Sequence, residues 1–292
     1  MSSRPFALVL LLVVVSFAAG SLFIKFKKNS PQVDSLIAAQ FEEKPLFLSP
    51  IKQAKSEPAR YLVTGITVPH HLLARDLIAK GFDYASANKY DSIVLLSPDH
   101  FNLGDSNIST TVSNFSTVFG VIQNNSVVTK FLKKLPFVHE QNFFYREHGL
   151  GAELPFVKYY FPESKIIILT FKEVTPKKEL DQVVDELKKI LPKNSLIVQS
   201  TDFSHYLTPE NAEIYDRETI KVLNEAVPDK LWDLKQPSNM DSIASQYVQS
   251  KLQKEFFGSK LKIIDHKNSQ DYTKQKITSS TSYIIQVYSK DF

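Results

Sequence analysis

Three apolar segments of the sequence each end in a polar cluster that contains a histidine. The segments are residues 63–68, 93–96 and 195–200, and the histidines that follow them are His70, His100 and His205. In α/β proteins, ligands bind beyond the carboxyl ends of buried strands, because the loops splay apart there into a crevice. We therefore expect the three histidines to converge on one site.

These histidines predict a metal site. Imidazole is the commonest protein ligand of transition metals, and three ligands from separate strand ends leave coordination positions open for a substrate. Asp202 lies three residues before His205, and its carboxylate could orient an imidazole, act as a base or bind the metal itself. The alternative is that each histidine merely caps a strand or packs in the core. That alternative is favoured for any one histidine alone, whereas the three together favour the metal site.

The other four histidines carry less information. His148 lies between a loop and a predicted helix, so it is either an acid or base beside the metal or a loop histidine without a role. His71 directly follows His70, and only one of two adjacent residues need face the site. His139 and His266 lack polar companions and are expected to be structural or exposed.

The N-terminus predicts a membrane segment. Residues 6–24 form an uncharged run of 19 residues, close to the ~20 that span a bilayer core. We favour an uncleaved anchor within residues 1–28, with a cleaved signal peptide as the second interpretation and a buried core helix as the third. The protein is thus expected to be anchored in a membrane by this one segment, or exported if the segment is cleaved. Lysines directly after the run leave the orientation open.

Charge and cysteine content exclude several functions. Four of the 35 Lys and Arg residues, and none of the 31 Asp and Glu residues, lie within residues 1–29. The remainder is therefore neutral overall and has no electrostatic footprint for nucleic acid. The chain has no cysteine, which excludes disulfides, thiolate nucleophiles and thiolate metal ligands.

The rest of the chain divides into a linker and a domain. Residues 29–60 are polar and contain four prolines, which is typical of a tether, and residues 61–292 are expected to form the folded domain. In the domain, segments with strand character (62–67, 92–97, 165–170, 195–200, 260–266 and 279–288) alternate with helical segments such as 72–88, 125–134 and 152–160. This alternation predicts a single α/β domain with a central mixed, largely parallel sheet flanked by helices.

Four short motifs occur in order along this domain. They are Val68-Pro69-His70, Leu96-Ser97-Pro98-Asp99-His100, Glu147-His148 with Glu153-Leu154-Pro155-Phe156, and Ser200-Thr201-Asp202-Phe203-Ser204-His205. Together they resemble the Memo family (mediator of cell motility and its prokaryotic relatives, called AmmeMemoRadiSam system protein B) over residues 62 to 288. The resemblance implies a fold similar to class III extradiol dioxygenases, with His70, His100 and His205 around a metal and an aspartate beside them. The implied cofactor is a divalent transition metal, with iron first and copper, manganese or zinc as alternatives.

The sequence departs from the family pattern at three places. Gly151 stands where the family has glutamate, and Glu153 stands where relatives have His or Gln. A late helical segment of the family carries a cysteine that joins the histidines, and we assign Asp241 to that position as a further metal ligand. A carboxylate in place of a thiolate favours harder metals, iron or manganese over copper(I). Alternatively, Asp241 is a plain helix cap.

Two functional classes follow from the resemblance. The first is a metal-dependent enzyme, either an oxygenase-like or redox catalyst or a hydrolase, in which His148 or Asp202 moves protons. The second is a non-catalytic module that binds a metal, a peptide or a small ligand in the same pocket. The family's prokaryotic name also implies radical-SAM and AMMECR-type proteins as partners. No nucleic-acid partner is expected, and contact with a membrane is expected through the N-terminal segment.

Overall fold

Four parallel strands at the centre of the fold position the histidines. They lie in the order β2 (Val63–Val68), β9 (Ser195–Ser200), β3 (Ser92–Pro98) and β8 (Lys165–Phe171). Every residue of β2, β9 and β3 is buried, as expected for strands that are covered on both faces and read as apolar runs. The four strands predicted at these places are confirmed.

The computed structural model describes residues 35–54 and 59–292. The remaining strands are β1 (Leu36–Ala38), β4 (Ile108–Thr110), β5 (Asn114–Thr117), β6 (Gly120–Ile122), β7 (Val138–Glu140), β10 (His205–Leu207), β11 (Lys260–Asn268) and β12 (Ser280–Ser289). The α-helices are α1 (Lys44–Gln53), α2 (Arg75–Ala85), α3 (Ser126–Leu132), α4 (His148–Gly151), α5 (Leu154–Tyr160), α6 (Lys177–Ile190), α7 (Pro209–Asn224) and α8 (Ile243–Leu252). Short helices of other types are η1 (Leu72–Ala74), η2 (Phe143–Arg146), η3 (Pro228–Asp233), η4 (Gln253–Phe257) and η5 (Ser269–Tyr272).

The prediction of a mixed sheet is confirmed, but the sheet is not largely parallel. In the described chain, β12 pairs antiparallel with β2, β10 and β11, and β4 pairs antiparallel with β8, while β4 and β7 are parallel. The main sheet is therefore mixed, with parallel strands at its centre. For β11 and β12 the reason is their connection, which holds only the short η5 and no crossover helix, so that the chain returns antiparallel.

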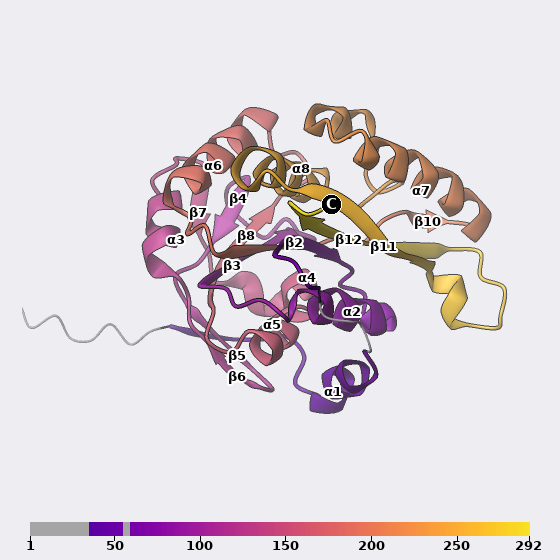
Figure 1. Cartoon of the computed structure of the whole chain (residues 1–292), viewed down its shortest axis with the longest axis horizontal. Helices are drawn as coiled ribbons and strands as arrows, with labels where there is room; N and C mark the ends of the chain where they lie inside the picture. Colours follow the sequence, from indigo (N-terminus) through magenta and orange to yellow (C-terminus); the bar gives the residue numbers. More distant parts are fainter. Residues whose placement is uncertain (1–34, 55–58) are drawn as a thin grey trace, which may run out of the picture. The chain divides into compact units, whose positions relative to one another are not determined.

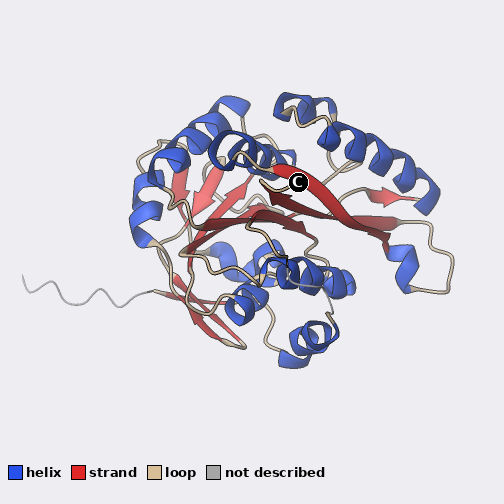
Figure 2. Cartoon of the chain, viewed as in Figure 1, coloured by secondary structure: helices blue, strands red, loops and turns tan. Residues whose placement is uncertain are grey.

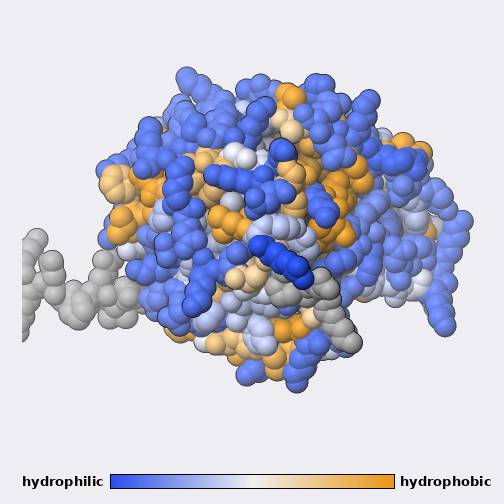
Figure 3. Space-filling view, in the orientation of Figure 1, coloured by the Kyte–Doolittle hydropathy of each residue, from blue (hydrophilic) through white to orange (hydrophobic). Residues whose placement is uncertain are grey.

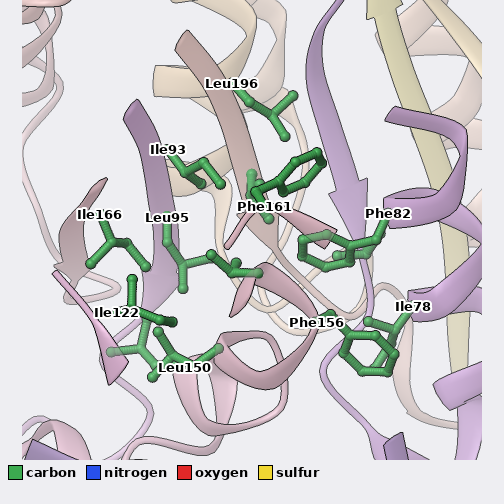
Figure 4. Close-up of a cluster of buried hydrophobic side chains, with 14 of the residues drawn as sticks. Ile78, Phe82, Ile93, Leu95, Ile122, Leu150, Phe156, Phe161, Ile166 and Leu196 are labelled. Atoms are coloured by element: carbon green, nitrogen blue, oxygen red, sulfur yellow. The ribbon is translucent and has the colours of Figure 1, made fainter. Parts of the chain in front are cut away.

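Helices cover both faces of this sheet. Alternate residues of β3 point to opposite sides: Ile93 and Leu95 belong to one buried cluster, and Val94 and Leu96 to the other. Helices α1, α2 and α5 lie on the first side, whereas α3, α6 and α8 lie on the second (Figures 1 and 2). Figure 4 shows the first cluster, in which Leu95 of the sheet lies among side chains such as Leu150 and Phe156 of the covering helices.

Part of the segment predicted as a linker folds with the domain. Strand β1 pairs parallel with β5, and Phe47 of α1 is fully buried with its ring centroid 5.4 Å from that of Phe156. The described residues all belong to one compact unit. Residues 36–38 and 44–53 thus contribute to the same core as the predicted domain.

The predicted membrane segment, residues 6–24, lies outside the described residues. Within residues 35–54 and 59–292, no helix has the length and apolar character needed to cross a bilayer. The longest of these helices, α7, has 16 residues and carries charged groups such as Glu210 and Arg217. The membrane segment in the predicted fold class and the predicted localisation at a membrane therefore have no support within the described residues.

A glycine in the middle of β2 makes room for buried glutamines of α8 and η4. The side-chain amide of Gln253 donates to the carbonyl of Thr64 (3.1 Å), and that of Gln249 donates to the carbonyl of Ile66 (3.3 Å). A Cβ on Gly65 would lie 2.4 Å from Nε2 of Gln253 and 2.7 Å from Nε2 of Gln249. Any larger residue at position 65 would displace both amides.

We therefore expect Gly65→Ala to lower the free energy of unfolding by about 1–3 kcal/mol, because the added methyl overpacks the core and breaks buried hydrogen bonds. Urea unfolding measures the loss. The double variant with Gln253→Ala should lose less than the sum of the two single variants, since one of the clashing amides is then absent. Strict additivity would show that the methyl does not disturb Gln253.

Candidate metal centre

His70 follows β2 and is held on two sides. Its Nδ1 lies 3.0 Å from Oγ of Ser200, and its backbone N–H donates to Oδ1 of Asp202 (3.1 Å). The hydroxyl of Ser200 donates to the carbonyl of Gly149 (2.6 Å), so its oxygen accepts from Nδ1–H of His70. This arrangement selects the tautomer in which Nε2 of a neutral His70 carries the lone pair.

His100 follows β3 and is held by a buried carboxylate. Glu147 is fully buried; its Oε1 lies 2.5 Å from Nδ1 of His100, and its Oε2 accepts the backbone N–H of His100 (3.0 Å). Carboxylate–histidine pairs of this kind orient metal-binding imidazoles and raise their basicity. The free nitrogen, Nε2 of His100, lies 3.1 Å from Nε2 of His70.

The carboxylate of Asp241 completes a triangle of donor atoms. Its Oδ2 lies 3.1 Å from Nε2 of His70 and 3.7 Å from Nε2 of His100. Donors around a tetrahedral ion with bonds of ~2.0–2.1 Å are separated by roughly 3.3 Å, which is similar to these spacings. Oδ1 of Asp241 is buried and has no hydrogen-bond partner among the described residues. The donor set therefore fits a transition-metal ion.

Asp241 reaches this place by pairing with the segment after β9. Its backbone N–H donates to the carbonyl of Asp202, and the backbone N–H of Asp202 donates to Oδ2 of Asp241, both at 3.1 Å. The N-cap of α8 is Ser242, whose side chain accepts the backbone N–H of Ser245. The alternative interpretation of Asp241 as a helix cap is therefore wrong.

His148 lies at the open side of the triangle. Its ring centroid is 3.9 Å from that of His100 and 5.2 Å from that of His70, and about a third of its side chain is exposed (34%). Each of these three histidines offers a nitrogen within 4.8 Å of the others. Burial, followed by the positive charges of His100 and His70, lowers the pKa of His148 to about 4. His148 is therefore neutral at pH 7 and can accept a proton or bind a metal.

His205, which was predicted at the site, and His71, which was left ambiguous, lie outside this group. The ring of His205 has Nδ1 against the carbonyl of Phe203 and packs beside Tyr206, with centroids 5.6 Å apart. Among the described residues, His70, His100 and His148 form a group that could hold a metal ion, and His205 is not part of this group. His71 bonds to the hydroxyl of Tyr283 (2.8 Å).

Several residues of the site were not assigned a role from the sequence. Glu147 holds His100 and Ser200 holds His70, and both residues belong to the motifs of the family resemblance. The sequence signal for Glu147 was its position directly before His148. Gly151, where the family has glutamate, has no room for a larger side chain. A Cβ there would lie 2.7 Å from Cβ of Gln40 in the N-terminal segment. That segment thus fills the space of a larger side chain.

The carboxylates around His100 favour positive charge at the site. Burial acts to lower the pKa of His100, but its hydrogen bonds to Asp241 and Glu147 outweigh burial and raise the pKa to about 10. The pKa of His70 is also raised, because the charges of Asp202 and Asp241 outweigh burial. Without a metal, these carboxylates favour the protonated forms of the two imidazoles. A metal cation would replace those protons.

This competition predicts opposite pH effects on stability and on metal binding. The folded-state pKa of His100, about 10, exceeds its ordinary value of 6.5. Its stabilising contribution is therefore complete below about pH 6.5 and is lost as the pH rises towards 10. We expect the free energy of unfolding of the metal-free protein to fall by a few kcal/mol between pH 6 and 10, while metal affinity rises over the same range.

Urea unfolding and metal titration at matched pH values measure these two slopes. His100→Ala is the control and should flatten both of them. Slopes of the same sign in the wild-type protein would contradict the prediction.

Comparison with known proteins places these observations in a family. A family model described as Memo-like protein matches residues 28–287. A MEMO1 family protein of Aquifex aeolicus is 28% identical over 189 residues, 63% of this chain and 70% of that protein. One of Methanopyrus kandleri is 25% identical over 150 residues, 49% of this chain and 53% of that protein. The chain thus spans between about half and 70% of the length of these two relatives.

One solved structure with a similar arrangement is that of an uncharacterized protein from Escherichia coli K12. Its sequence identity is 12% and its TM-score is 0.49, and the alignment covers 75% of this chain and 98% of that chain.

Proposed function

The chain belongs to the Memo family, and on this basis we propose that it binds a divalent transition metal through His70, His100 and Asp241. The observation that supports this most directly is the triangle of their free donor atoms, with sides of 3.1, 3.1 and 3.7 Å. In both histidines the ring nitrogen that faces away from the triangle, Nδ1, is held by a hydrogen bond. Its partner is Ser200 for His70 and Glu147 for His100. Such outer anchoring is typical of metal ligands.

Iron is the metal that this donor set favours. Two imidazoles and one carboxylate with open positions are typical of non-haem iron(II) sites, and the absence of thiolate disfavours copper(I). Manganese, zinc and copper are the alternatives. When bound, such a metal supplies a redox-active or Lewis-acidic centre with positions free for a substrate.

The surrounding residues divide into positioning and proton-transfer groups. Asp202 accepts the backbone N–H of His70 while its own backbone N–H binds Asp241, so it holds two ligands in place. His148 is neutral and about a third exposed. It is the group able to accept a proton from an incoming substrate. We therefore favour a metal-dependent enzyme over a non-catalytic module, with Asp202 as a positioning residue.

The test is metal content and affinity of the full-length protein, purified without oxygen and measured by inductively coupled plasma mass spectrometry and titration. We expect about one metal ion per chain in the wild type, and loss of stoichiometric metal in His70→Ala and His100→Ala. His139→Ala is the matched control, because His139 pairs with Asp105 at the surface and should retain the metal. A wild-type protein that is metal-free and also fails to bind iron, manganese, zinc or copper would contradict the proposal.

Turnover is tested separately from binding. If His148→Gln keeps the metal affinity of the wild type but loses activity towards a substrate, His148 has the proton-transfer role. A bound metal with activity unchanged in this variant would exclude that role and leave the metal site intact.

A further inference from the structure

A cavity of about 630 Å³ lies between the end of α7 and the start of β11. It is at the opposite end of β2 from the metal centre, because its floor residue Gln253 bonds to Thr64 near the start of β2, whereas His70 follows the strand's end. Its volume is within the range of small-molecule sites, ~300–1,000 Å³. Figure 3 shows hydrophobic residues gathered on this face, beside the position of the C-terminus in Figure 1.

The lining of the cavity includes apolar side chains, here called its walls, and buried polar side chains, here called its floor. Leu223 and Leu231 are buried wall residues. On the floor, the hydroxyl of Tyr288 donates to Oε1 of Gln286 (2.7 Å), and the amide of Gln253 donates to a backbone carbonyl. Because these polar groups already have hydrogen-bond partners within the protein, the floor has little free capacity to hold a charged group. A ligand would place its apolar body in the cavity and any charge at the rim.

The rim of the cavity has unneutralised positive charge. Its lining includes Glu225, Lys254 and Lys260. Glu225 pairs with Lys230, and the ammonium of Lys254 donates to the carbonyl of Ala226 just after α7 (3.1 Å), which offsets the negative end of that helix. Among the described ion pairs, none involves Lys260. An anionic group at the rim would meet Lys260 and Lys254 without competition from a free carboxylate.

We propose that this cavity binds a small amphipathic anion, an apolar chain or ring that carries one carboxylate. The apolar body contacts Leu223 and Leu231, and the carboxylate lies between Lys254 and Lys260. This inference does not depend on the metal centre. It adds a second ligand site to the protein, at the opposite end of the sheet.

Trp232 provides a probe for this site in the full-length protein. It is the chain's single tryptophan and directly follows the wall residue Leu231. We expect titration with octanoate to change its fluorescence saturably, and octan-1-ol, which lacks the charge, to bind more weakly. Lys260→Ala should weaken octanoate binding about 2–5-fold, as for a partly exposed ion pair, and leave octan-1-ol unchanged.

Two further variants sharpen the test. Lys262→Ala removes the same charge two residues along β11 but outside the lining, so it should bind octanoate like the wild type. Val222→Phe fills part of the cavity from a half-buried position of α7 and should weaken binding of both probes at least tenfold. Thermal unfolding and circular dichroism check that Val222→Phe folds. If Val222→Phe does not fold, the loss of octanoate affinity in Lys260→Ala tests the proposed site by itself.

Three outcomes would overturn the proposal. The first is the absence of octanoate binding by both fluorescence and calorimetry. The second is binding that neither Lys260→Ala nor Val222→Phe alters, which would place the probe elsewhere on the protein. The third is equal affinity for octanoate and octan-1-ol, which would show that the carboxylate does not contribute to binding.

Discussion

Replacing Glu147 by glutamine is expected to lower the free energy of unfolding of the metal-free protein by about 3–5 kcal/mol at pH 7. Glu147 is fully buried, and its two oxygens accept the backbone N–H of His100, the backbone N–H of Gly149 and Nδ1–H of His100. Glutamine keeps the volume but removes the negative charge, and it turns one acceptor into a donor. The imidazolium of His100 would lose one of its two carboxylate partners, Asp241 being the other, and its pKa would fall from about 10.

The matched control is Glu153→Gln. Glu153 is also fully buried, but neither carboxylate oxygen has a hydrogen-bond partner among the described residues. Burial, with the charge of Asp202, raises the pKa of Glu153 well above its ordinary value, which favours the protonated form that glutamine imitates. We expect a change within about 1 kcal/mol for this variant by urea unfolding. Equal losses in the two variants would show that the ion pair with His100 contributes nothing.

The positions of His70 and His100 could be predicted from the sequence because each follows a buried strand within a few residues. Strands β2, β9 and β3 are neighbours and parallel, so their carboxyl ends meet at one edge of the sheet. His205 could not be placed in this way. It lies five residues beyond the last residue of β9, and the next residue, Tyr206, has a left-handed backbone (φ 59°). The path of such a loop depends on tertiary contacts that spacing does not encode.

The contribution of residues 36–53 to the fold could not be predicted, for a different reason. Residues 29–60 contain four prolines and many polar residues, so their composition is typical of a linker. Burial of only a few side chains, such as Ile37 and Phe47, joins β1 and α1 to the core. Gln40 follows in this segment and fills the space beside Gly151. A sequence pattern cannot show that a residue from a distant segment occupies the place of a missing side chain.

Replacing Asp241 by cysteine is expected to change the metal preference of the site. Its Oδ2 is the anionic donor nearest to Nε2 of both His70 and His100, and the family resemblance assigns a cysteine to this position. A thiolate favours soft ions and a carboxylate favours hard ones. We expect affinity for manganese(II) and iron(II) to fall about tenfold or more, and affinity for copper(I) to rise by a similar factor. Anaerobic competition titrations of the metal-free proteins measure these ratios.

Asp241→Asn distinguishes the donor's chemistry from its charge. Asparagine keeps the shape and an oxygen but loses the charge, so it should weaken binding of every metal without reversing the order of preference. In the wild-type protein, the backbone N–H of Asp202 donates to Oδ2 of Asp241. The asparagine oxygen can still accept this bond, whereas a thiolate is only a weak acceptor. If cysteine and asparagine produced the same changes in affinity, Asp241 would act through the Asp202 segment and would not be a metal ligand.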